Sequence, residues 1–250
     1  TMPIPKLLLT MSGPMMISMF IQALYNVVDS MFVSYISEAA LTAVSLAYPM
    51  QNLMIAVATG TGVGVNALLS RNLGEKNYSM ANRVAGNAIF LGLVSYVVFA
   101  LLGLLGSRFY FSVQVEDPNI IALGHDYLSI VTVLSIGCFG QVLLSRLLQS
   151  TGKTFYSMVI QMVGAGLNLV LDPIMIFGLL GFPKMGVAGA AYATVISQGI
   201  SAILCLIYIY LRIPSLAPNR HHWKLHGQES RNQLAVGIPM ALQFAITASG

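Results

Sequence analysis

The feature that most constrains the fold of this chain is the length of its charge-free apolar runs, of which the longest covers residues 39–70. A helix needs about 20 apolar residues to cross a bilayer, whereas strands of an outer-membrane barrel alternate apolar and polar residues over about 10 positions. The runs in this chain are continuously apolar. Only 8% of the residues are charged, against about 25% in soluble domains. The sequence therefore predicts an all-α polytopic membrane protein.

Six apolar stretches are long enough to span a membrane, which predicts a six-helix transmembrane bundle. We place the spans at 13–35, 41–69, 86–107, 126–146, 155–179 and 186–211. A seventh apolar segment opens near Asn232 and runs to Gly250.

Basic residues are distributed unevenly between the two sides of this predicted bundle. Ten of the 12 Lys and Arg residues lie in the N-terminal segment and in the loops on its side of the membrane, and only Arg108 and Lys184 lie on the other side. By the positive-inside rule, we expect the N-terminus in the cytoplasm, in a bacterial or archaeal cytoplasmic membrane. The distribution of the basic residues thus indicates the orientation of the chain in the membrane, and no nucleic-acid partner is expected.

The longest polar segment, 212–231, is predicted to be a cytoplasmic connector at the membrane surface. Trp223 would lie among the lipid headgroups, and the basic residues would face anionic lipid. The segment also holds His221, His222 and His226. A metal site at these histidines is the alternative, although no acid or cysteine stands at ligand spacing from them.

The start of the seventh segment resembles the start of the first, since Gly13-Pro14-Met15-Met16 compares with Ile238-Pro239-Met240-Ala241. Six predicted spans separate the two prolines, so both copies would have the same orientation. This arrangement is typical of parallel repeats about an axis along the membrane normal. We therefore expect residues 1–211 to form one lobe, and residues 232–250 to be the truncated first helix of a second lobe.

Two acids, Asp29 and Asp172, lie inside the predicted spans. A charge in hydrocarbon costs at least about 2.5–3.5 kcal/mol on insertion scales, so such residues are usually functional. The first and fifth predicted helices both run outward, and each acid lies about 6 residues, or about 9 Å, from the outer end of its span. The two acids are therefore expected at matching depth, where they could share a site.

Polar side chains accompany these acids, either at helical spacing or at similar depth. They are Gln22, Tyr25, Asn26, Asn168 and Thr194. Pro173 has no N–H, which leaves the carbonyl of Leu169 without its helical donor. Clusters made only of oxygen ligands suit hard cations. Three uses stay open: binding protons, binding Na⁺, or neutralising a cationic substrate. The alternative is that each acid only hydrogen-bonds a neighbouring helix.

Small residues and prolines inside the spans predict packing features. Gly60 and Gly64 have the spacing of a close helix–helix contact. Pro14, Pro49 and Pro173 are candidates for helix bends. The two cysteines, Cys138 and Cys205, are interpreted as small apolar fillers.

The chain resembles the multidrug and toxic compound extrusion (MATE) transporter family. The resemblance rests on the run Gln22-x-x-Tyr25-Asn26-x-x-Asp29-x-x-Phe32-Val33 in the first predicted helix. It rests further on Leu148-Gln149-Ser150-Thr151-Gly152-Lys153, on Asn168-Leu169-Val170-Leu171-Asp172-Pro173-Ile174-x-Ile176-Phe177-Gly178, and on Gly186-Val187-Ala188-Gly189-Ala190-Ala191. These motifs follow one another in the family's order through most of the chain.

The resemblance implies a twelve-helix transporter with two six-helix lobes, of which residues 1–211 are the N-lobe and residues 212–231 the connector. It implies an antiporter, not an enzyme, which exports amphipathic and often cationic compounds in exchange for Na⁺ or H⁺. The implied site for the coupling cation, with Na⁺ as the metal, consists of Asp29, Asn168, Asp172 and Thr194, adjoined by Gln22, Tyr25 and Asn26. No cofactor beyond the coupling ion is expected, and the partners expected are small organic cations, membrane lipid and either the missing C-lobe or a second copy.

Alternatives from other classes stay open at this point. A lipid-linked precursor flippase of related fold would need basic side chains facing its cavity, and we expect no Lys or Arg within the spans. A retinal pump would need a lysine in residues 232–250, which hold none. A non-transporting half-transporter fragment is a further alternative. Neither the coupling ion nor the exported compound can be named from the sequence.

Overall fold

The structure, a computed structural model, describes residues 4–216 and 227–248, and every regular element in them is a helix. The helices are α1 (Ile4–Ser34), α2 (Glu38–Gly74), α3 (Tyr78–Gln114), α4 (Pro118–Val133), α5 (Ile136–Ser150), α6 (Thr154–Phe177), α7 (Val187–Arg212) and α8 (Gly227–Ala248), with the 3-10 turns η1 (Leu179–Gly181) and η2 (Pro214–Leu216). Trp223 and the three connector histidines, His221, His222 and His226, lie outside the described residues.

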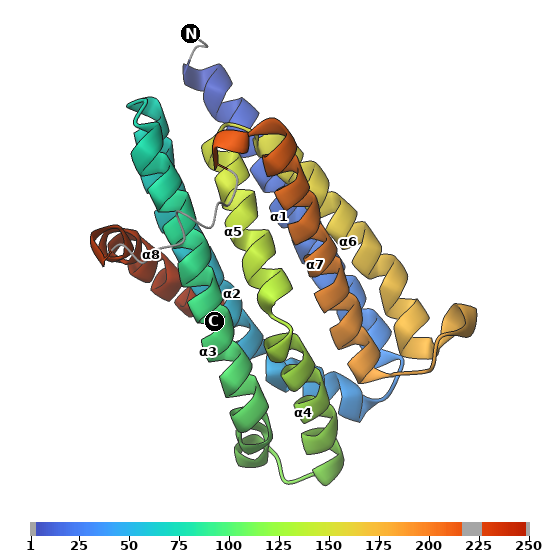
Figure 1. Ribbon diagram of the computed structural model, residues 1–250. Coiled ribbons are helices and arrows are strands. Elements are labelled where there is room, and N and C mark those ends of the chain that lie inside the picture. The colour runs from blue at the N-terminus through green and yellow to red at the C-terminus, as the bar shows by residue number, and fades with distance from the viewer. Residues whose placement is uncertain (1–3, 217–226, 249–250) are drawn as a thin grey trace.

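The helices run up and down as a bundle, with α5 between α3 and α7 (Figure 1). Five of the described helices are long and apolar enough to cross a membrane, or six spans if α4 and α5 form one bent span. The prediction of an all-α polytopic bundle is therefore confirmed. We call the end where α1 begins the basic end of the bundle, because the residues gathered there are Arg71, Lys76, Arg83, Arg146, Lys153 and Arg212.

The helices extend beyond the predicted spans, because hydropathy marks only the part of a helix that suits hydrocarbon. Arg146, the last residue of the predicted span 126–146, lies inside α5, one turn before the last residue of that helix, Ser150. Arg83 and Arg108 likewise lie inside α3. The expectation that basic residues stay outside the spans is thus wrong at Arg146, whose side chain is half-buried in the bundle.

The predicted span 126–146 is not one straight helix, because α4 and α5 meet at an angle of 45°. Near the end of α4, the hydroxyl of Thr132 donates a hydrogen bond to the carbonyl of Leu128 in the same helix at 2.6 Å. The break follows at Leu134 and Ser135, and Gly137 then packs directly against the backbone of Gly199 in α7. Ser and Gly residues commonly permit such kinks. Hydropathy does not reveal the break, because the apolar run continues through it.

Local capping explains where several helices begin and end. The Ser37 side chain accepts a hydrogen bond from the N–H of Ala40 at the start of α2, and Asn77 accepts one from Met80 at the start of α3. These contacts satisfy N–H groups that have no partner inside the helix. At its other end, α6 stops at Gly178, whose φ of 73° lies in the left-handed region that favours glycine.

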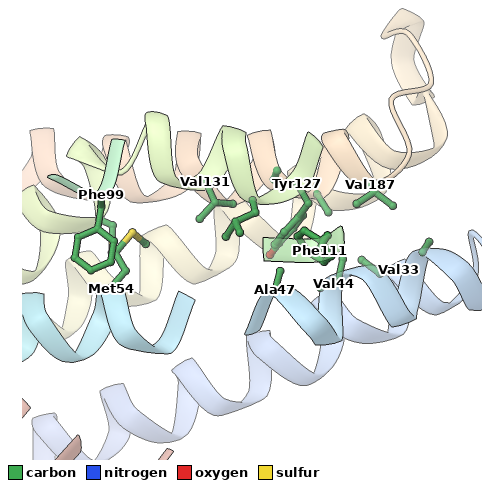
Figure 2. Close-up of a cluster of buried hydrophobic side chains, with 14 of the residues drawn as sticks. Val33, Val44, Ala47, Met54, Phe99, Phe111, Tyr127, Val131 and Val187 are labelled. Carbon is green, nitrogen blue, oxygen red and sulfur yellow. The ribbon is translucent and has the colours of Figure 1, made fainter. Parts of the chain in front are cut away.

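A cluster of buried apolar side chains fills the half of the bundle away from the basic end. In it Phe99 lies beside Met54, and Tyr127 and Phe111 lie close to Ala47 (Figure 2). A second cluster fills the basic half; its largest fully buried members are Leu69, Leu147, Leu148 and Ile209. In a bilayer such cores hold helices together by close packing rather than by escape from water.

Glycines set the closest helix contacts, and the predicted close contact at Gly60 and Gly64 is confirmed. Both glycines of α2 face the backbone of α8, where Gly60 meets Gly237 and Gly64 meets Gln233. The contact between α2 and α8 is the most extensive between any two helices of the described residues. Figure 1 shows α8 lying across α2 and α3 at the edge of the bundle.

Candidate cation-binding site

Two buried residues of α6 form the centre of the candidate site. Asn168 and Asp172 lie one helical turn apart, and their side chains are only 3% and 1% exposed. The Nδ2 atom of Asn168 donates to Oδ1 of Asp172 at 3.4 Å and to Oγ1 of Thr194 at 3.4 Å. Thr194 belongs to α7, so this one amide joins two helices at the site.

The close approach of α6 and α7 depends on a glycine on the α7 side. Gly189 faces the backbone of Met175 and Ile176, and a Cβ atom there would lie 2.6 Å from the carbonyl carbon of Met175. Atoms do not approach that closely, so only glycine allows the two helices to meet here. Thr194 follows just over one turn later in α7, at the level of Asn168.

Helix α1 supplies the second acid. This helix packs chiefly against α6, and the carboxyl group of Asp29 lies close enough to that of Asp172 for the two groups to interact. Ionised carboxylates only accept hydrogen bonds, and two of them side by side repel each other. A proton or a cation held between the two groups would remove this repulsion.

Several oxygen atoms at this point lack a hydrogen-bond partner among the described residues. They are Asp29 Oδ1, Asp172 Oδ2 and Asn168 Oδ1, all buried. Buried polar atoms are normally paired, so this set has spare capacity for a ligand. Oxygen donors suit a hard cation such as Na⁺, and the described residues contain no group of three His, Cys, Asp or Glu side chains that could hold a transition metal.

A cavity adjoins the site. The volume that the centres of water molecules can occupy in it is about 60 Å³. Asn168 and Thr194 line it near the acids, and hydroxyl and amide side chains from α1, α5, α6 and α7 line much of the rest. No charged side chain is among the described residues that line it. A cavity needs only about 10–15 Å³ of this kind of volume to hold one water molecule, so several fit.

The other predicted site residues lie at different distances from the cluster. Tyr25 and Gln22 line the cavity. Asn26 is half-buried on α1 but is not among the residues lining the cavity. The three prolines, Pro14, Pro49 and Pro173, lie inside α1, α2 and α6 without ending these helices.

Sequence reasoning missed several polar residues near the site. Tyr127 of α4 is only 1% exposed, donates to Gln51 of α2 at 3.5 Å, and lies near both acids. The cavity residues Ser197 and Ser201 follow Thr194 at helical spacing, as Asn168 follows Gln161. Those two polar stripes could have been found from periodicity, whereas nothing in the sequence connects Tyr127 to the acids.

Comparison with known proteins agrees with this architecture. The model of the MatE family matches residues 14–174, a range that contains both acids. The chain therefore belongs to the MATE family of membrane transporters.

The more similar relatives are bacterial. The chain is 32% identical over 205 residues to a FAD transporter of Shewanella oneidensis, a match that covers 78% of this chain and 43% of the relative. It is 27% identical over 242 residues to the multidrug export protein MepA of Staphylococcus haemolyticus, which covers 96% of this chain and 53% of the relative. The chain thus spans about half the length of these relatives.

Solved structures show the same fold. A multidrug resistance MATE family transporter in an outward-facing conformation superposes with a TM-score of 0.87 at 28% identity, over 96% of this chain and 52% of that one. A transporter of the MOP superfamily from Pyrococcus furiosus gives a TM-score of 0.86 at 28% identity, with the same coverage of both chains.

Proposed function

We propose that this chain forms the cation-binding lobe of a secondary antiporter, which exports amphipathic and often cationic compounds in exchange for Na⁺ or H⁺. The observation that carries the proposal is the cluster of Asp29, Asn168, Asp172 and Thr194. It holds two carboxyl groups close enough to interact and three buried oxygen atoms without partners in the described residues. Filling this cluster with a cation would remove a repulsion that nothing else in the cluster neutralises.

The domain organisation and orientation follow from the same proposal. Residues 1–211 form the N-lobe, residues 212–231 the connector, and residues 232–250 the first part of helix seven. Alternating access needs two lobes that move against each other, so transport requires a second lobe or a second copy. The basic end would face the cytoplasm because Lys and Arg concentrate there.

The substrate class is proposed from the chemistry of the cavity and from the names of the relatives. One relative is called a multidrug export protein, which agrees with this class, whereas the other is called a FAD transporter, and FAD is an anion. Neutral amides and hydroxyls line this lobe's cavity, and none of its described lining residues is basic. Such a lining offers little to a phosphate headgroup, which disfavours a lipid-linked precursor flippase.

Thermal unfolding in the presence of Na⁺ tests the cation site. The 250-residue chain and its Asp172→Asn variant would be compared with and without Na⁺, in mildly acidic and mildly alkaline buffer. A ligand that binds only the folded state stabilises it by about 2.7 kcal/mol when its concentration is about 100 times Kd. We expect Na⁺ to raise the midpoint of the wild type in alkaline buffer and to leave Asp172→Asn unchanged.

The two coupling ions give different outcomes in this experiment. A Na⁺ shift that needs Asp172 identifies a sodium site. No Na⁺ shift, together with a pH-dependent stability that disappears in Asp172→Asn, identifies a proton site. If wild type and variant respond alike to Na⁺ and to pH, the acids serve only to hold helices together, and the proposal is wrong.

A further inference from the structure

A chain of hydrogen-bonded side chains leads from the cavity toward the basic end of the bundle. Gln161 of α6 donates to Ser157 at 3.3 Å, and Gln149 of α5 also donates to Ser157 at 3.3 Å. Arg146 then donates from Nη1 to Oε1 of Gln149 at 3.0 Å. We call these four residues, Arg146, Gln149, Ser157 and Gln161, the polar chain. Ser157 is 0% and Gln149 7% exposed, so the chain runs through the interior.

The polar chain is continuous with the cation site. Gln161 lines the cavity that Asn168 and Thr194 line at its other end. From Asn168 to Ser157 the path follows α6 for 11 residues, or about 16 Å at about 1.5 Å per residue. That length is about half of the hydrocarbon thickness of a bilayer, which is about 30 Å. Polar groups therefore reach from the acids to within a turn of the start of α6.

Unused hydrogen-bonding capacity along this path indicates water. The hydroxyl of Ser201 faces Gly164 and has no hydrogen-bond partner among the described residues, although it is buried. A Cβ atom on Gly164 would collide with that hydroxyl, so the glycine keeps this part of the cavity open. A water molecule needs two to four polar partners, and the amides of Gln161 and Gln198 are further lining groups here.

Arg146 stands at the basic end of this path. Its stem packs against Gly62 of α2, where an added Cβ would lie 2.8 Å from Arg146 Cγ. Within residues 4–216 and 227–248, no ion pair joins its guanidinium to a carboxylate. Arg146, Gln149 and Ser157 are not among the residues that line the cavity, so beyond Gln161 the path consists of side chains bonded directly to one another. A fixed positive charge beside such a path raises the barrier to cations, while its hydrogen bond to Gln149 holds the polar chain in place.

We propose that the cavity and the polar chain are a hydrated route inside this lobe, by which a small monovalent cation passes between the basic end and the Asp29/Asp172 cluster, with Arg146 as its gate. This inference rests on the proposed function, because it supplies a path to the same cation site. It requires no contribution from a second lobe, since every residue involved lies in α1 to α7.

The two native cysteines provide a matched pair for the test. Cys138 lines the cavity, whereas Cys205 is equally buried and is not among the lining residues. Silver ion is a small monovalent cation that thiolates bind tightly. The 250-residue chain in sealed vesicles would receive Ag⁺ on the basic-end side, and mass spectrometry would report which cysteine remains free. We expect Ag⁺ to reach Cys138 and to spare Cys205.

Arginine and glutamine variants test the gate and the chain. Removing the charge in Arg146→Gln should speed the reaction of Cys138 by about tenfold, as expected for a unit charge a few ångströms from a cation's path. Arg83→Gln removes an exposed arginine of the same end and should leave the rate unchanged. Gln161→Leu should slow the reaction, and it tests the path independently if Arg146→Gln does not fold.

Two results would overturn the route. One is equal modification of Cys138 and Cys205, and the other is the same Cys138 rate in Arg146→Gln as in Arg83→Gln. The Na⁺ and pH measurements on Asp172→Asn separate this failure from that of the proposed function. If the Na⁺ or pH effect is present but the Cys138 rates are the same in all variants, only the route is overturned. Open access to Cys138 without any Na⁺ or pH effect overturns the proposed function.

Discussion

At the scale of single residues, Asn168 organises the candidate site. Its amide nitrogen donates to both Asp172 and Thr194, which are on different helices. The Nδ2 group of Asn168 thus donates to two other residues of the site, while its Oδ1 atom has no partner among the described residues. The amide therefore fixes the distance between α6 and α7 and leaves one oxygen available for a cation.

Thr194→Val should weaken cation binding without removing it. Valine keeps the shape of threonine but removes Oγ1, so the site loses one oxygen and Asn168 loses one acceptor. We expect the Na⁺ concentration for half-maximal stabilisation to rise by about tenfold, the lower part of the range seen when groups supporting a metal ligand are removed. The measurement is a Na⁺ titration of the midpoint of thermal unfolding.

A matched control for this change is Thr132→Val. Thr132 is buried like Thr194 (1% and 5% exposed), but its hydroxyl donates to the carbonyl of Leu128 in its own helix. This variant can lower stability, yet its Na⁺ dependence should equal that of the wild type. If both valine variants shift the titration equally, Thr194 is not a ligand.

Much of the candidate site could be predicted from the sequence, because helical spacing relates Asn168 to Asp172 and topology relates the depth of Asp172 to that of Asp29. Depth does not show which helices touch, so the proximity of the acids needed the structure. Tyr127 could not be predicted at all. Its approach to the acids depends on how α4 packs, and no local pattern encodes that packing.

At the scale of helices, the contact between α2 and α8 depends on backbone meeting backbone. Gly60 and Gly64 on α2 face Gly237 and the backbone of Gln233 on α8. Small residues at such positions allow helices to approach closely in a membrane. Side chains added there cannot be accommodated by rotamer changes, because the neighbouring atoms belong to the main chain.

Alanine at two glycines should therefore change stability in opposite directions. In Gly64→Ala the new methyl collides with the Gln233 carbonyl, and overpacking of this kind costs about 1–3 kcal/mol. In Gly166→Ala the methyl meets nothing within 4 Å, and a glycine-to-alanine change inside a helix stabilises by about 0.5–1 kcal/mol. Thermal or denaturant unfolding of the two variants in detergent measures whether each change lowers or raises stability.

Limited proteolysis locates the effect of Gly64→Ala. Cleavage between α7 and α8, followed by separation of the fragments, should release α8 more readily from this variant than from Gly166→Ala. Equal stability of the two variants would mean that α8 does not pack on α2 as described.

At the scale of the whole molecule, the asymmetry of charge predicts orientation. We expect Lys153, at the basic end, to face the cytoplasm, and Glu116, between α3 and α4, to face the other side. Both side chains are exposed. In a background with Cys138 and Cys205 replaced by alanine, a membrane-impermeant maleimide should label Glu116→Cys in intact cells. It should label Lys153→Cys only after the cells are opened, and the reverse pattern would contradict the orientation.

The helical class and the number of apolar stretches could be predicted from the sequence, because a chain in hydrocarbon must satisfy its backbone within each helix. The bend between α4 and α5 could not be predicted, since Thr132 and Ser135 are tolerated in straight helices as well. The lengths of the helices were also missed. Helices such as α3 continue past the hydrocarbon region, where charged residues like Arg83 no longer carry a cost.

The amide network beneath α8 has a consequence for how this helix becomes stable in a membrane. Asn87 of α3 donates to Gln233 at 2.8 Å, Ser230 donates to Asn87 at 3.0 Å, and Gln233 donates to the carbonyl of Val84 at 3.0 Å. By its own hydropathy α8 is not among the helices that qualify as spans in the described part of the chain. Lipid would leave these polar groups unsatisfied, whereas α3 pairs them. The polar side chains of α8 are thus satisfied by α3, so we expect α8 to be stable in a membrane only when it is packed against α2 and α3.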